Sequence, residues 1–189
     1  MGELRALELR AALAWAAGRT LNRISIDGDQ STSDMAVLLS SGTKGHADPA
    51  VFREALHEVL AGLAEDVVRN GEGTSHVIRV TVSGARDDAA AAGAGKAVVN
   101  SPLVKTAVCG NDPNVGRLAG AIGDWAGSAA PWLDPASVSV RVGGVEVLTG
   151  GVFRLDAAKE QRLSEYLRTA AFDPAMRGFP EHDRSVDID

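Results

Sequence analysis

The sequence predicts a protein of the α/β or α+β class, because helical and strand patterns alternate along most of its length. Residues 49–69 repeat apolar side chains every three or four positions, which is typical of an amphipathic helix. Residues 77–82 instead place Ile78, Val80 and Val82 on one face, with the period of two of a β-strand. The chain has 189 residues, of which 45% are hydrophobic, so it is long enough to bury a core.

The N-terminal part predicts a helix followed by a strand. The helix ends near Gly18, and its apolar face is formed by Leu4, Leu7, Leu9, Leu13 and Ala16. In Asn22–Asp27 two isoleucines alternate with polar residues, which predicts a half-buried strand. Asp27–Asp34 is polar and turn-forming, and periodicity assigns no structure to the short apolar run Met35–Leu39.

The remaining elements are predicted by caps and turn residues. Asp48 and Pro49 mark the start of the helix over 49–69, and Asn70-Gly71 ends it. The apolar stripe of this helix contains Phe52, Leu56, Val59, Leu60, Leu63 and Val67. Further helices are expected over 87–100, 114–125 and 156–169, with a hairpin of strands 138–142 and 145–148 around Gly143-Gly144. Val186 and Ile188 begin a last strand, and its exposed edge is expected to make the chain prone to aggregation.

Composition and charge exclude several classes of protein. The formal net charge of −6 leaves no basic footprint for nucleic acid. The single cysteine, Cys109, cannot form an internal disulfide. No apolar run is long enough to span a bilayer, and residues 1–5 lack the pattern of a signal peptide. We therefore expect a soluble cytoplasmic protein with no internal domain boundary over residues 1–189.

Three familiar catalytic motifs are incomplete in this sequence. Gly93–Lys96 resembles a phosphate-binding loop, but positions 90 and 97 are both Ala, so we expect the small residues to serve close helix packing. His57-Glu58 lacks the second zinc-binding His at position 61, and Gly73–Val77 lacks the closing Gly of a nucleophile elbow. The four histidines, His46, His57, His76 and His182, are scattered, and Cys109 is expected to be a packed thiol.

Three polar, Gly-containing segments remain as candidates for function, because loops often carry binding and catalytic residues. They are Asp27–Asp34, Asn70–Thr74 and Asn100–Arg117. In and around them the sequence resembles the glutamate N-acetyltransferase (ornithine acetyltransferase) family of arginine biosynthesis. Asn22–Asp34 is similar to the family's N-R-I-(S/T)-V-D-G-D-x-S-T-N-D, and Val68–Thr74 to V-R-D-G-E-G-A-T. Residues 100–107 and 110–117 are similar to N-S-P-L-V-K-T-A and E-D-P-N-W-G-R.

The resemblance implies an activity and a fold. Family members transfer an acetyl group from N-acetylornithine to glutamate, and some also use acetyl-CoA as donor; no metal and no resident cofactor are implied. A precursor cuts itself before a threonine, whose free amine can then serve as base. The preceding chain supplies the oxyanion hole, and both pieces build a four-layer α/β/β/α sandwich.

The sequence also departs from the family pattern. The nucleophile's segment, similar to K-G-x-G-M-I-x-P-N-M-A-T-M-L, has no counterpart in these 189 residues, and Ser33 and Val115 replace the usual Asn and Trp. We therefore interpret residues 1–189 as part of the second (beta) subunit, truncated at both ends and incomplete as a sandwich. The expected partner is the family's N-terminal (alpha) chain in a heterotetramer. The isolated chain is predicted to be inactive, and the alternative is a catalytically inactive remnant that acts at most as a binding or interaction module.

Glu72 is the one candidate binding residue. By resemblance, its carboxylate contacts the amine of the amino-acid substrate, and Gly71 and Gly73 allow a close approach. Without the resemblance, the same three residues are a helix stop with a solvated Glu. No catalytic residue and no metal ligand is predicted.

The neighbouring polar residues are assigned mainly structural roles. We expect Asp27, Asp29 and Asp34 to hold a loop through backbone hydrogen bonds, and Pro113 and Asn114 to fix a turn before a helix. Two roles stay open for Lys105 and Arg117, which could shape an anionic pocket or pair with Asp112.

Overall fold

The computed structural model describes residues 6–43, 45, 47–172 and 184–189. By its internal contacts the chain forms two compact units, Met1–Val68 and Arg69–Asp189. The boundary falls at the end of a long helix, where no change of composition marks it.

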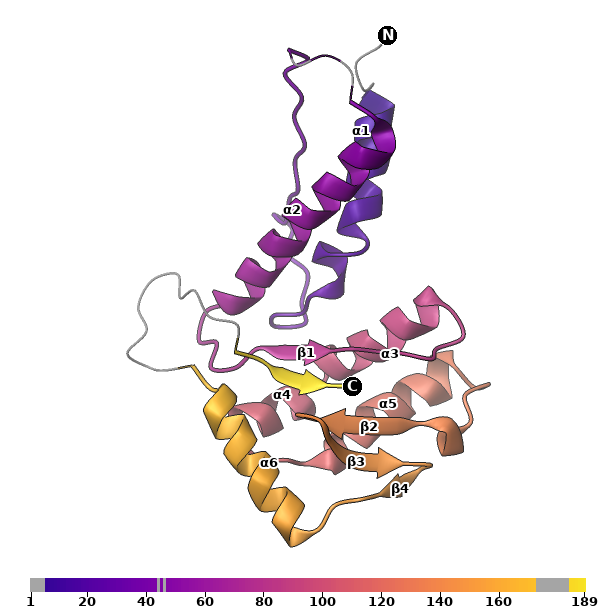
Figure 1. Cartoon of the computed structure of the whole chain (residues 1–189), viewed down its shortest axis with the longest axis vertical. Coiled ribbons are helices and arrows are strands. Elements are labelled where there is room, and N and C mark those ends of the chain that lie inside the picture. Colours follow the sequence, from indigo (N-terminus) through magenta and orange to yellow (C-terminus); the bar gives the residue numbers. More distant parts are fainter. Residues whose placement is uncertain (1–5, 44, 46, 173–183) are drawn as a thin grey trace. The chain divides into compact units, whose positions relative to one another are not determined.

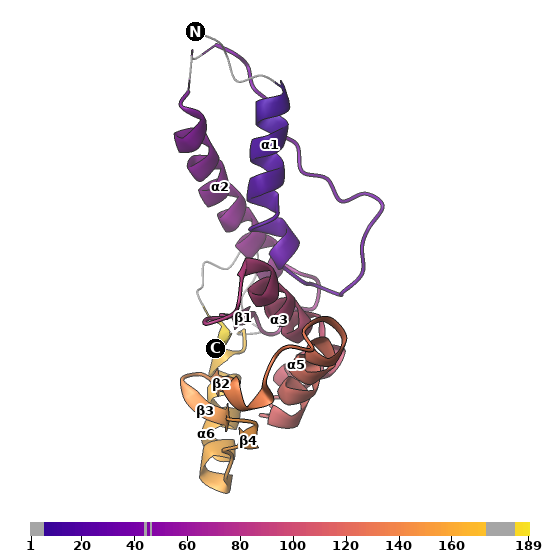
Figure 2. The same cartoon turned by 90° about the vertical axis from the view of Figure 1, so that its right-hand side faces the viewer.

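Within its described residues, the first unit contains two α-helices (Figure 2). They are α1 (Ala6–Ala17) and α2 (Pro49–Arg69), both as predicted. The guanidinium of Arg53 on α2 lies 4.4 Å from the centre of the Trp15 ring on α1, and the His57 ring lies 5.7 Å from it. The carboxylate of Asp48 caps α2 by accepting the N–H groups of Ala50 (2.8 Å) and Val51 (3.1 Å).

The predicted apolar stripe of α2 is only partly buried. Leu60 is 7% exposed, whereas Val59, Leu63 and Val67 are 60%, 50% and 49% exposed. The periodicity thus predicted the helix correctly but not how much of its apolar face is covered.

The strand predicted over Asn22–Asp27 is wrong. Leu21–Arg23 form the 3₁₀ turn η1, and residues 24–27 are irregular. The turn is fixed locally: the Thr20 hydroxyl donates to the carbonyl of Ala16 (2.8 Å), and the Arg23 side chain donates to that of Gly18 (3.0 Å). A strand needs a neighbouring strand for its backbone groups, and the described part of this unit contains none.

The second unit is built on a five-stranded mixed sheet (Figure 1). Its spatial order is β1-β5-β2-β3-β4. The β1–β5 pair is parallel, and the other neighbours are antiparallel. The strands are β1 (Ile78–Val80), β2 (Ser139–Val142), β3 (Val145–Thr149), β4 (Val152–Phe153) and β5 (Val186–Ile188).

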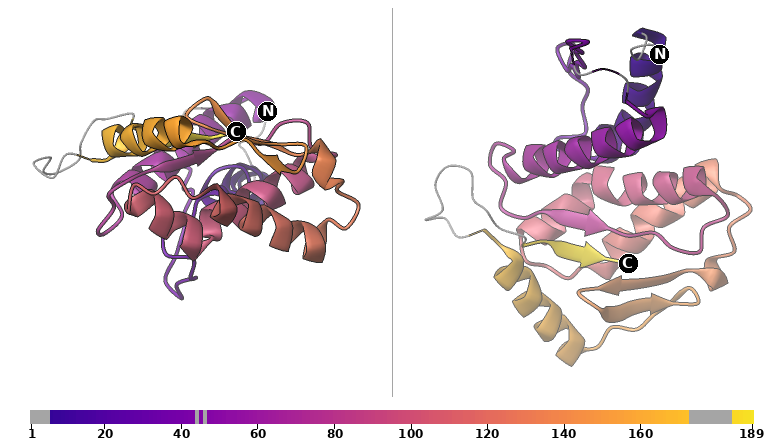
Figure 3. Two further views of the ribbon diagram at one scale, coloured as in Figure 1. Left: turned by 90° about the horizontal axis from the view of Figure 1, so that it is seen from below. Right: turned by 45° about the horizontal axis from the view of Figure 1, so that its top comes forward.

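Helices pack on this sheet and close its core. Three of them lie together on one side of the sheet (Figure 3): α3 (Asp88–Asn100), α4 (Pro102–Cys109) and α5 (Val115–Ala129). The fourth, α6 (Ala157–Ala170), buries Leu163 and Leu167 in the same apolar cluster as Val104 of α4. A short 3₁₀ turn, η2 (Pro135–Ser137), precedes β2.

The hairpin between β2 and β3 turns at the predicted residues. Gly143 and Gly144 have φ values of +53° and +73°, the left-handed values that the two central residues of a type I′ turn need. The helices predicted over 87–100, 114–125 and 156–169 are likewise confirmed, α5 extending four residues further, to Ala129.

The last strand is not the exposed edge that the sequence suggested. β5 lies between β1 and β2, and Val186 and Ile188 are 0% and 3% exposed. The expectation of aggregation at this edge therefore loses its basis, because both sides of β5 are paired.

One α-helix and one strand were missed, as was the short turn η2, and the missed helix changes the candidate site. Asn100–Arg117 was expected to be a loop, but it contains α4, which the Ser101 hydroxyl caps at the N–H of Val104 (3.3 Å). Pro102 at the first helical position is a start signal that could have been used. β4 is only two residues long and was also missed.

The fold class is confirmed as α+β with a mixed sheet. Among the described elements there is one sheet, so the layers present are part of the α/β/β/α arrangement that the resemblance implies. Within the same residues, no helix is both long and apolar enough to cross a bilayer.

Candidate functional site

Glu72 lies at the tip of a tight turn just before β1. The N–H of Thr74 donates to the carbonyl of Gly71 (3.1 Å), which closes the turn around Glu72 and Gly73. Gly73 has a φ of +70°, a conformation that side chains with a Cβ rarely adopt. The Glu72 side chain is exposed, so its carboxylate is presented to solvent and can meet a ligand.

The two residues after this turn are fastened to α6. The Ser75 hydroxyl lies 3.0 Å from Nδ1 of His76, and Nε2 of His76 lies 3.1 Å from the carbonyl oxygen of Leu167. Because a carbonyl only accepts, Nε2 carries the proton, and Nδ1 then accepts the Ser75 hydroxyl. The N–H of Phe172 also donates to the Ser75 carbonyl (2.9 Å). These bonds hold the chain that leads away from Glu72.

Ser75 also connects the Glu72 turn with the next candidate segment. Its hydroxyl lies 3.6 Å from the sulfur of Cys109, the last residue of α4. Segments 70–74 and 100–117 therefore approach each other through Ser75 and Cys109, two residues that the sequence analysis did not connect. Cys109 is a free and exposed thiol, so its prediction as a packed thiol was wrong.

The segment after α4 is held by its own polar side chains. Asp112 donates its N–H to the carbonyl of Ala107 (2.9 Å), and its carboxylate accepts the side-chain amide of Asn114 (3.3 Å). The N–H of Val115 donates to the carbonyl of Pro113 (2.9 Å), which confirms the turn expected before α5. Asn111 has a φ of +56°, unusual for a residue other than glycine, and its buried Oδ1 has no hydrogen-bond partner within the described residues.

Arg117 has a structural partner. Its guanidinium donates to the carbonyl oxygen of Leu103 on α4 (2.9 Å), across 14 positions of the chain. This bond joins the start of α5 to the start of α4. Two roles were left open for Arg117, pairing with Asp112 and shaping an anionic pocket. The bond to Leu103 is a third role, a structural one, and it requires neither of them.

The polar loop of the first unit is held as expected. The carboxylate of Asp27 accepts the N–H of Asp29 (3.0 Å), and that of Asp34 accepts the N–H of Ser31 (3.3 Å). Asp27 and Asp34 thus have the structural role assigned to them, whereas Asp29 contributes its backbone. The pattern of short polar side chains in the sequence thus predicted correctly that Asp27 and Asp34 hold this loop through backbone hydrogen bonds.

The incomplete motifs have structural explanations. A Cβ added at Gly93 would lie 2.7 Å from Nε1 of Trp125, so this glycine allows α3 and α5 to pack closely, as predicted. His57 packs against Trp15, and His76 holds α6. His46 and His182 lie outside the described residues. Within the described ranges, no three His, Cys, Asp or Glu side chains are grouped so that they could hold a metal ion.

Comparison with known proteins identifies the family. The model of the ArgJ family matches residues 3–175. The chain belongs to the ArgJ family. Two of its relatives are named for the same pathway or reaction. Glutamate N-acetyltransferase Oat2 of Streptomyces clavuligerus is 57% identical over 105 residues, which are 56% of this chain and 27% of that protein. Arginine biosynthesis bifunctional protein ArgJ of Bifidobacterium longum is 44% identical over 117 residues, 61% of this chain and 30% of that protein.

A solved ArgJ structure has the same fold. Arginine biosynthesis bifunctional protein argJ from Bacillus halodurans superposes with a TM-score of 0.78 and 32% identity, over 99% of this chain and 82% of that one. The segments matched in the two sequence relatives are less than a third of those proteins' length. The matches therefore establish the ArgJ family and its fold for this chain.

Proposed function

We propose that this chain is part of an ArgJ-type glutamate N-acetyltransferase, which transfers an acetyl group from N-acetylornithine to glutamate in arginine biosynthesis. The proposal rests above all on the family match over residues 3–175. It is supported by the name of the Streptomyces clavuligerus relative, a glutamate N-acetyltransferase.

Within that reaction, Glu72 is proposed to bind the substrate's amine. Both substrates of the transfer contain an amino acid, and an ammonium group is matched by a carboxylate acceptor. Glu72 is exposed at the tip of a turn with Gly73 beside it, and a Cβ at Gly73 would meet nothing within 4 Å, so the space next to the carboxylate is open. Ser75 and His76 hold the following residues in place, which limits the positions the carboxylate can take.

The nucleophile and the oxyanion donors are proposed to come from outside these 189 residues. The family's threonine segment has no counterpart in the sequence, and the alpha chain would supply the oxyanion hole. A polypeptide of exactly this sequence should therefore show no acetyl transfer. The alternative function, a binding module without catalysis, makes the same prediction for the isolated chain, so the deciding experiment has to supply the missing parts.

The deciding experiment is a chimaera. The matching segment of the Streptomyces clavuligerus enzyme is replaced by the corresponding residues of this chain, and acetyl transfer from N-acetylornithine to glutamate is measured. We expect turnover, and we expect Glu72→Gln to lower kcat/KM by about 100-fold, because a charge-assisted contact to the substrate is lost. Acetyl-CoA in place of N-acetylornithine tests the second donor.

Two controls make the result decisive. Glu165→Gln removes an exposed carboxylate from α6 and should leave turnover unchanged. Circular dichroism shows whether each chimaera is folded. A folded chimaera without turnover would favour the inactive remnant, and a Glu72→Gln variant as active as its parent would remove Glu72 from the substrate site.

A further inference from the structure

The pair Asn70-Gly71 follows the last residue of α2 and directly precedes Glu72. The side chain of Asn70 is exposed. In such a pair the backbone nitrogen of the glycine can attack the side-chain carbonyl carbon of the asparagine, because glycine has no Cβ to hinder the approach. A C–N bond then forms between the glycine nitrogen and the asparagine Cγ, and the side-chain amide leaves as ammonia. The product is a succinimide ring.

Water opens the succinimide ring at either of its two carbonyl carbons. Opening at Cγ gives aspartate, whose main chain is unchanged. Opening at the backbone carbonyl gives isoaspartate, in which the main chain passes through Cβ and Cγ of residue 70 and is one atom longer. Both products carry a new negative charge, and the only co-reactant is water.

The attacking nitrogen of Gly71 is not held by a hydrogen bond. Within the part of the chain that the structure describes, no acceptor lies at the N–H of Gly71, although its carbonyl accepts the N–H of Thr74 (3.1 Å). A backbone N–H that donates to a carbonyl must first break that bond before its nitrogen can attack a neighbouring side chain. The nitrogen of Gly71 is therefore available to the side chain of Asn70.

The other asparagines of the chain differ from Asn70 in this respect. They are Asn22, Asn100, Asn111 and Asn114. After each of them, the next residue has a Cβ and donates its N–H to a carbonyl: Arg23 to Thr20 (2.8 Å), Ser101 to Val98 (3.2 Å), Asp112 to Ala107 (2.9 Å) and Val115 to Pro113 (2.9 Å). The structure thus distinguishes Asn70 from the other four asparagines.

We propose that Asn70 is a site of spontaneous deamidation and that its isoaspartate form displaces Glu72. The extra main-chain atom lies directly before Gly71, whose carbonyl closes the turn around Glu72. Ser75 and His76 are held by α6, so the added length has to be taken up within the turn. The modification itself is independent of the proposed acetyl transfer, whereas its effect on substrate binding rests on that proposal.

The modification is tested on the full chain in buffer made with heavy-oxygen water, which labels each asparagine converted during the incubation. Peptide mass spectrometry compares the folded chain with the chain unfolded in urea. We expect Asn70 to react at a similar rate in both, and the other four asparagines to react at least about tenfold more slowly in the folded chain, because each following N–H must first be released. The rate at Asn70 should increase from about pH 7 to about pH 9, since the attack requires loss of the amide proton.

Two outcomes of this labelling would overturn the modification site. One is protection of Asn70 in the folded chain to the same degree as the other asparagines. The other is equal labelling of residue 70 in the variant Asn70→Gln, whose longer side chain forms the corresponding ring much less readily.

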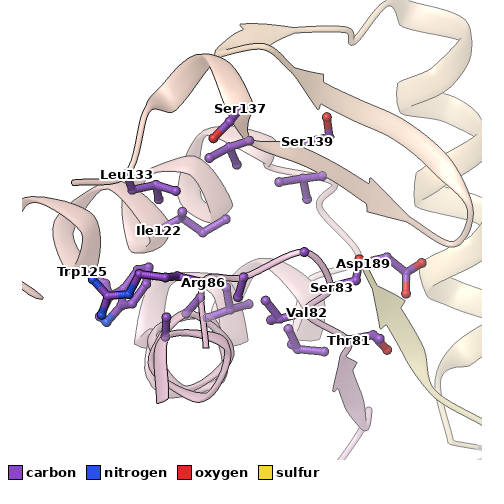
Figure 4. Close-up of a pocket in the computed structure, with 18 of the residues that line it drawn as sticks. Thr81, Val82, Ser83, Arg86, Ile122, Trp125, Leu133, Ser137, Ser139 and Asp189 are labelled. Atoms are coloured by element: carbon purple, nitrogen blue, oxygen red, sulfur yellow. The ribbon is translucent and has the colours of Figure 1, made fainter. Parts of the chain in front are cut away.

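Hydrogen exchange tests the displacement of the turn. Ion-exchange chromatography separates the deamidated chain by its added charge, and fragmentation in the mass spectrometer identifies the isoaspartate form. In that form the amide of Thr74 should exchange faster, because its acceptor on Gly71 has moved. The control is the amide of Thr81, which donates to the carbonyl of Ile188 (2.9 Å) beside the cavity at the other end of β1 (Figure 4). Unchanged exchange at Thr74 would overturn the displacement.

The chimaera described above tests the effect on catalysis. We expect kcat/KM to fall in proportion to the fraction of isoaspartate, whereas an Asn70→Gln chimaera incubated in the same way should keep its own starting activity. A fresh chimaera without turnover would contradict the acetyl transfer alone, because labelling and exchange are measured on the chain itself. An active chimaera that keeps its activity with isoaspartate at residue 70 would overturn the effect on Glu72.

Discussion

At the scale of single residues, the hairpin glycines differ in a way that only the structure reveals. Gly143 and Gly144 both have positive φ values, so the sequence and the turn type treat them alike. The space around the two glycines, however, differs. A Cβ at Gly143 would lie 2.7 Å from the ring of Tyr166, whereas a Cβ at Gly144 would meet nothing within 4 Å.

We therefore expect Gly143→Ala to be much more destabilising than Gly144→Ala. Both variants bear the cost of a left-handed alanine, about 1 kcal/mol, and Gly143→Ala adds the displacement of a packed ring, for a total of about 2–4 kcal/mol. Urea denaturation measures the free energy of unfolding of each variant. Equal losses would mean that the Tyr166 ring moves aside at no cost.

The Tyr166 ring is held in place by two hydrogen bonds of its hydroxyl group. Its hydroxyl donates to the carbonyl of Ser185 (3.3 Å) and accepts the N–H of Asp187 (2.9 Å). Burial raises the pKa of this hydroxyl above its ordinary value of 10.0, so it stays protonated and can donate at neutral pH. A side chain of α6 thereby supports β5, the strand that joins β1 to β2.

At the scale of elements, helix caps were the most reliable signals in the sequence. Asp48, the predicted cap, accepts backbone N–H groups at the start of α2. Asp87 and Asp156, the first residues of the helices predicted over 87–100 and 156–169, act as caps in the same way. The strand over Asn22–Asp27 failed because two alternating isoleucines do not reveal whether a partner strand exists. The contact between Ser75 and Cys109 could not be predicted either, because it joins residues 34 positions apart and depends on how α4 packs.

The cap of α3 makes a prediction about pH. The Ala90 N–H, and then the neighbouring Arg86 side chain, hold the pKa of Asp87 below its ordinary value of 3.8. A carboxyl with a lowered pKa in the folded state stabilises the fold above its unfolded pKa, and this contribution is lost as the pH falls through the folded value. Asp87→Asn keeps a capping oxygen but does not titrate.

We therefore expect the stability advantage of the parent over Asp87→Asn to be present at about pH 6 and to shrink toward about pH 3. Urea denaturation at the two pH values measures it, and Asp124→Asn on the exposed side of α5 is the control. An advantage that stays constant over this range would show that the charge of Asp87 contributes nothing.

At the scale of the whole molecule, the apolar core belongs to one of the two units. The cluster of buried side chains that closes the core runs from Val98 to Ile188 and lies entirely within Arg69–Asp189. Neither the composition of the chain nor a linker in its sequence gave an indication of this division. The sequence therefore predicted the class and most elements of the second unit, but not which part of the chain holds the core.

We expect a polypeptide of residues 69–189 to fold without the first 68. Its sheet and its buried cluster are complete within that range, so the loss of α1 and most of α2 removes none of the residues that form the cluster. Calorimetry should show one cooperative thermal transition. A broad transition without a heat-absorption peak would mean that the first unit is required for the core.

The place of β5 between β1 and β2 also determines when the sheet can form. Ile78 and Val186 are paired although more than a hundred residues separate them, and β5 follows every other strand in the order of synthesis. On the ribosome, β1 and the β2–β3–β4 meander must remain unconnected until residues 184–189 have emerged. Parallel pairing over such a separation is intrinsically slow. The sheet of the second unit is thus expected to close only after β5 has been synthesised, with its apolar strand faces open in the meantime.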